Sequence, residues 1–121
     1  MTTASGHTEA IRASRVIGTS VYNKEGKHIG TIEDVVLDKT SNSIMFAVIG
    51  FGGFLGIGES YHSIPWSVLD YEKSHGGYVV PFTKEQLEAA PHDSIDALTR
   101  GDGTNTRDKS YEYYNVPPYW M

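Results

Sequence analysis

Three residues of the chain supply the side-chain types of a hydrolytic triad, namely Ser60, His62 and Asp70. In such a triad a histidine accepts the proton of the attacking serine, so the two side chains must lie within hydrogen-bonding reach. Residues two apart on a strand face the same way, but their side chains are separated by about 7 Å. The spacing of Ser60 and His62 therefore argues against nucleophilic catalysis, and we expect no enzymatic activity.

The spacing of the five histidines along the sequence does not indicate a metal site. No histidine is followed by another at the second or fourth residue, the spacings that aim two imidazoles at one ion from a strand or a helix. His62 alternates with Ile64 and Trp66 near Glu59, and we interpret it as a hydrogen-bonded structural residue in preference to a ligand or a pH switch. The full set is His7, His28, His62, His75 and His92.

Acidic residues form two short lines, one from Glu33 to Asp38 and one at Asp70 and Glu72. A hard cation needs several oxygens that converge from one loop, as in D-x-D-x-D-G, and this pattern is absent. We interpret these residues as a solvated face of the fold and expect neither a metal nor a cofactor.

A glycine-rich stretch, GFGGFLGIGESYHSIPW, runs from Gly50 to Trp66. Its segment from Gly53 to Ser60 has the glycines and the hydroxyl of a phosphate-binding loop, but Glu59 stands where that loop needs lysine. The stretch also precedes a predicted strand instead of a helix. It therefore indicates a sharply turned corner that glycine makes possible, and not a nucleotide site.

Composition limits the class of protein. The chain has 121 residues, no cysteine and a formal net charge of -5, and its lysines and arginines do not cluster, which argues against nucleic-acid binding. The uncharged run from 40 to 58 is too short in its apolar part to span a bilayer, and the N-terminus has no secretory signal. We expect a cytoplasmic protein without membrane insertion, able at most to associate peripherally with a membrane.

Eight tyrosines and thirteen glycines favour strands and tight turns. The first two strands, at 20–22 and 29–37, are joined by a turn in which Gly26 takes the left-handed conformation. A change in the apolar pattern predicts a β-bulge near Glu33-Asp34. Thr83 and Gln86 match a capping box, so a short helix follows the last strand and ends at Pro91. The later strands are expected at 44–51, 60–66, 68–71 and 78–82.

The strand at 44–51 is apolar on both faces, so both faces must be shielded from water. One alternating set fills the interior, and the other must be covered by the C-terminal segment, a helix or a second copy of the chain. The tail, YEYYNVPPYWM, is rich in aromatic rings and is expected to be extended. The predicted partner surface is Met45, Ala47, Ile49 and Phe51 with Tyr119 and Trp120 of the tail.

Three blocks of sequence together resemble the PRC-barrel family: the segment G-x-I-x-x-V-V-L-D from Gly30 to Asp38, the glycine-rich block from Val48 to Glu59, and I-P-W from Ile64 to Trp66. The resemblance covers residues 14–92 and implies a small β-barrel. This barrel also occurs in the H subunit of the photosynthetic reaction centre and, as a protein-binding module, in a ribosome maturation factor. The resemblance brings no set of active-site residues, and the expected absence of a transmembrane helix argues against a reaction-centre subunit.

These observations predict an all-β, single-domain barrel of about six short, mostly antiparallel strands with a short C-terminal helix and an extended tail. Residues 1–13 are expected to be a flexible leader, 14–92 the barrel, and 93–121 a short helical turn with an aromatic and proline tail. The expected function is a non-enzymatic, homodimeric interaction or scaffold module that binds a protein partner. The alternative is a small-ligand binding protein with a pocket rimmed by the glycine-rich loop, Tyr61, His62 and Trp66.

Overall fold

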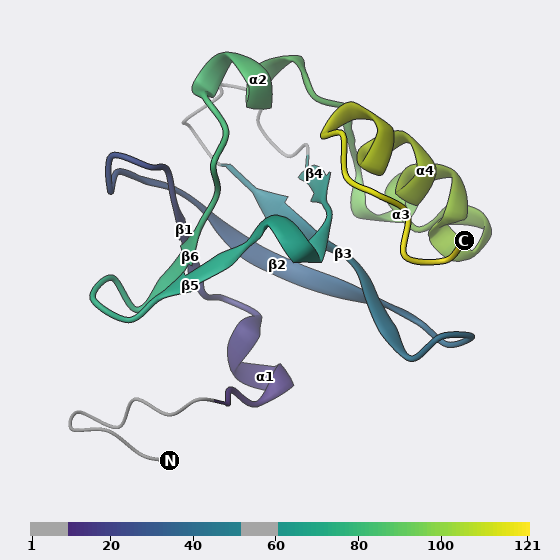
Figure 1. Ribbon diagram of the computed structural model, residues 1–121, viewed down its shortest axis with the longest axis horizontal. Helices are drawn as coiled ribbons and strands as arrows, with labels where there is room; N and C mark the ends of the chain where they lie inside the picture. The colour runs from purple at the N-terminus through teal and green to yellow at the C-terminus, as the bar shows by residue number, and fades with distance from the viewer. Residues whose placement is uncertain (1–9, 52–60) are drawn as a thin grey trace.

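The computed structural model describes residues 10–51 and 61–121. The predictions made for most of the leader, for the glycine-rich corner and for Ser60 and Glu59 lie outside these described residues. Figure 1 shows the described part of the chain as one twisted sheet with helices above, beside and below it.

A seven-stranded sheet forms the centre of the fold, in the order β5-β6-β1-β2-β3-β4-β7. Strands β1 and β6 pair in parallel, and every other neighbouring pair is antiparallel. The prediction of a mainly antiparallel β fold is therefore confirmed. The strands are β1 (Ser20–Tyr22), β2 (His28–Asp38), β3 (Ser43–Gly50), β4 (Tyr61–Ile64), β5 (Asp70–Glu72), β6 (Gly77–Val79) and β7 (His92–Asp93).

The sheet is not closed into a barrel by hydrogen bonds among the described residues, which corrects the predicted barrel in this respect. Its two edges are β5 and β7, which do not pair with each other. Pro65 follows β4 directly and has no N–H to donate, and the chain then turns through the 3-10 helix η3 (Trp66–Val68) before β5 begins. The two strands on either side of this turn, β4 and β5, are consequently not neighbours in the sheet.

The local turn chemistry agrees with the sequence. Asn23 accepts hydrogen bonds from two backbone N–H groups of its own turn, and Gly26 and Asn42 both have positive φ. The pairing of β2 with β3 shifts register between Ile32 and Asp34, so the predicted bulge at Glu33 is confirmed. Each of these features depends on residues within a few positions of one another.

Close packing of two strands explains the glycine at position 30, which opens the first of the three sequence blocks named above. A Cβ atom added to Gly30 on β2 would lie 2.6 Å from the carbonyl oxygen of Gly50 on β3. Real Cβ atoms do not approach backbone oxygens so closely, so this crossing of two strands requires glycine.

The helices are short except the last. The capping box predicted at Thr83 and Gln86 is present at the start of α2, and Ser94 caps α3. The prediction of an extended tail from Tyr111 is wrong at its start, because Gly103, with φ of 75°, leads into the ten-residue helix α4, which ends at Tyr113. The helices are α1 (Ala13–Val16), α2 (Lys84–Ala89), α3 (Ile95–Leu98) and α4 (Thr104–Tyr113), with 3-10 turns η3 and η4 (Arg100–Gly103).

Side chains of β3 contribute to two separate apolar clusters. The larger cluster contains Ala47, Ile49 and Phe51 with residues of β1, β2, β4 and α2. The smaller one contains Met45, Phe46 and Val48 with Leu98 of α3. Residues 94–121, which we call the C-terminal segment, therefore cover one face of β3, and the rest of the domain covers the other.

Candidate functional site

The predicted partner surface on β3 is buried within the single chain. Met45, Ala47, Ile49 and Phe51 are at most 4% exposed. Three of them lie in the larger core cluster, and Met45 lies beneath the C-terminal segment. Of the covers that the sequence left open, the structure favours intramolecular packing, so these four residues form no exposed face in one chain.

The two tail residues of the predicted surface also pack within the chain. The Tyr119 hydroxyl donates a hydrogen bond to Oδ2 of Asp38 at 2.6 Å, which lowers the pKa of that carboxyl. The guanidinium carbon of Arg107 lies 3.7 Å from the centre of the Trp120 ring. The end of the tail is thereby attached both to β2 and to α4.

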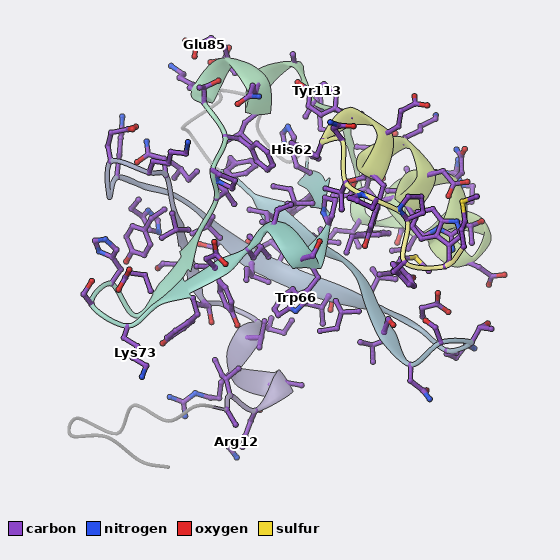
Figure 2. The ribbon with its side chains drawn as sticks, in the orientation of Figure 1. Arg12, His62, Trp66, Lys73, Glu85 and Tyr113 are labelled. Atoms are coloured by element: carbon purple, nitrogen blue, oxygen red, sulfur yellow. The ribbon has the colours of Figure 1, made fainter. Side chains whose placement is uncertain are left out.

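The residues of the predicted ligand pocket do not converge. Tyr61 packs against the smaller cluster, whereas Trp66 packs against the larger one and contacts Tyr78. In Figure 2, His62 on β4 lies in the upper part of the view and Trp66, in η3, lies well below it. The structure therefore gives no support to a pocket built from these three side chains.

Two of the three triad residues, His62 and Asp70, are among the described residues, and they do not come together. His62 is fully buried on β4, while Asp70 is exposed on the edge strand β5. Since β4 and β5 are not neighbours in the sheet, the two side chains have no route to a direct hydrogen bond. Ser60 lies outside the described residues.

His62 is the most unusual polar residue among those described. It is 0% exposed, and neither ring nitrogen makes a hydrogen bond of good geometry. The pKa of His62 is lowered to about 4, mainly by burial and also by the nearby His92, while a hydrogen bond with the Leu87 backbone acts in the opposite direction. His62 is therefore a buried, neutral imidazole, and the Leu87 backbone is the polar group that acts on its ring.

The structure brings His62 together with His92, a pair that the sequence analysis missed. The two residues are directly opposite each other where β4 pairs with β7. Their ring centres are 5.4 Å apart and the ring planes are tilted by 36°. No local spacing signals this pair, because thirty positions separate the two residues and β7 has only two residues.

An exposed apolar area lies at the far end of the β2–β3 hairpin, which extends past the other strands in Figure 1. Leu37 is 63% exposed although it lies within a strand. It is paired with Ile44 and is two residues from Val35, so the three share one face of the hairpin. We call these three residues, with the half-buried Trp66 and Val68 of η3 that pack against the same cluster as Val35, the hairpin strip.

The open seven-stranded sheet with short helices packed on it defines a small β-rich domain. The model of one family, the PRC-barrel domain, matches residues 8–87, and the chain belongs to this family. No curated protein matches the chain. Within residues 10–51 and 61–121, no helix is long and apolar enough to cross a membrane.

Proposed function

We propose that this chain is a non-enzymatic, cytoplasmic interaction module that works as a homodimer. The observation that supports the proposal is the hairpin strip, where Leu37 exposes 63% of its surface on a rigid strand. Water contact with apolar side chains on a regular element is unfavourable, and such areas often mark interfaces. The protein-binding role implied by the family resemblance points in the same direction.

The chemistry of the strip favours a second copy of the chain as its partner. All five side chains are apolar, so pairing one strip with another buries them without removing a charge from water. Asp38, which follows Leu37 on β2, is already bound by Tyr119 within the chain. A two-fold axis through the strip would place each Leu37 against the apolar residues of the other copy.

The proposal is tested by sedimentation velocity of the full chain over a range of micromolar concentrations. We expect the wild type to form dimers and Leu37→Asp to remain a monomer with an unchanged circular dichroism spectrum. Ile11→Asp is the matched control, because Ile11 is also an exposed aliphatic residue but lies outside the strip. A wild type that is monomeric at the highest concentration contradicts the proposal, and so does a Leu37→Asp variant that still dimerises.

A further inference from the structure

The paired histidines of β4 and β7 have the arrangement of a two-ligand metal site. His62 and His92 are cross-strand partners, and their ring centres lie 5.4 Å apart. Two imidazoles bound to one tetrahedral ion, at about 2.0–2.1 Å from each nitrogen, place their ring centres roughly 5 Å apart. The observed spacing of the ring centres therefore matches that of two imidazoles on one ion.

The buried ring nitrogens of His62 favour ligand binding, because a ligand would satisfy their polar atoms. A buried polar atom without a well-formed hydrogen bond costs free energy, and neither ring nitrogen of His62 makes a hydrogen bond of good geometry. A metal ion would accept the lone pair of one nitrogen. The Leu87 carbonyl, which already influences His62, is placed to receive the N–H of the other nitrogen, as backbone carbonyls do behind metal-bound histidines.

The surroundings of the pair leave a path for the ion. His92 is exposed, so an ion can arrive from solvent on its side, while His62 holds it from the buried side. Among the described residues, no group of three histidine, cysteine or acidic side chains is close enough to share one ion. The remaining coordination positions would therefore be filled by water or by a small exogenous ligand.

We propose that His62 and His92 together bind a late first-row divalent metal ion of the Zn²⁺, Ni²⁺ or Cu²⁺ type. Neutral imidazole suits these ions, whereas Mg²⁺ and Ca²⁺ prefer oxygen ligands. The proposal is independent of the proposed function, because the pair is not part of the hairpin strip.

The test is thermal unfolding of the full chain at neutral pH with ZnCl2 or with MgCl2. We expect Zn²⁺ to raise the Tm of the wild type, because an ion that binds the native state stabilises it, and Mg²⁺ to leave the Tm unchanged. His92→Ala should abolish the shift, and folding of this variant is not at risk because His92 is exposed. His75→Ala is the matched control, since His75 is an exposed histidine whose neighbour is Tyr22 and not His62.

A second measurement identifies the buried ligand. In ¹⁵N-edited NMR spectra, Zn²⁺ should shift the ring nitrogen signals of His62 and His92 together, and His62→Gln should abolish the shift at His92. The proposal is overturned if Zn²⁺ raises the Tm of wild type and His92→Ala equally. It is also overturned if Zn²⁺ produces no shift in the wild type, or if His75→Ala alone removes the effect.

Discussion

His62 combines complete burial with ring nitrogens that make no hydrogen bond of good geometry, so protonating the ring in the native state is costly. The pKa of His62 is lowered from 6.5 to about 4, mainly by burial, so the native chain keeps the ring neutral over this interval. An unfolded chain takes up the proton near its ordinary pKa. Protons therefore favour the unfolded state as the pH falls from 6.5 towards 4.

We predict that the native state loses stability between pH 6.5 and pH 4 because of His62. The shift of the pKa corresponds to roughly 3 kcal/mol at its full extent. Urea unfolding of the wild type at several pH values should show this loss, and His62→Leu should show a flatter pH dependence. His75→Ala, which removes an exposed histidine, should keep the slope of the wild type. If the free energy of unfolding falls with pH equally in the wild type and in His62→Leu, His62 is not the cause of the loss.

At the scale of elements, α4 shows how tertiary contacts form a helix that its own sequence does not indicate. Its two buried residues, Ser110 and Tyr111, are adjacent and not four positions apart, so the helix lacks an apolar stripe. The Ser110 hydroxyl instead donates to the Ser63 carbonyl of β4 at 2.8 Å, and the Tyr111 hydroxyl donates to the Met45 carbonyl of β3 at 2.9 Å. These two buried hydrogen bonds attach the helix to the sheet.

We predict that Ser110→Ala lowers the free energy of unfolding by about 1 kcal/mol, because the buried Ser63 carbonyl loses a hydrogen-bond donor. Urea unfolding of the full chain measures this change. Ser74→Ala is the matched control, since its hydroxyl makes an exposed hydrogen bond to Glu72 and should change stability by less than about 0.5 kcal/mol. An effect of Ser110→Ala no larger than that of Ser74→Ala would mean that this bond does not help to hold α4.

The elements predicted correctly from the sequence are those determined by neighbouring residues. The capping box at Thr83, the left-handed Gly26 and the bulge at Glu33 all follow from local chemistry. Features that depend on distant residues were missed, including α4 and the two-residue strand β7 that brings His92 to His62. Apolar pattern showed that both faces of β3 had to be covered, but it could not say which segment would cover each face.

At the scale of the whole molecule, the C-terminal segment completes the fold beyond the residues that the family model matches. The match ends at residue 87, yet Leu98 of α3 packs in the same cluster as Phe46 and Val48. Figure 1 shows α3 and α4 together beside β3 and β4. Because β3 is covered in this way, the apolar side chains of the β2–β3 hairpin that remain exposed lie at its end, around Leu37.

Concentration-dependent NMR spectra of the ¹⁵N-labelled full chain test most directly whether this strip is the surface through which two copies pair. We predict that amide signals of residues 35–37, 44 and 66–68 shift as the concentration rises through the micromolar range. The same signals should stay in place in Leu37→Asp. Spectra that do not change with concentration, or changes confined to residues outside the hairpin strip, would contradict the account.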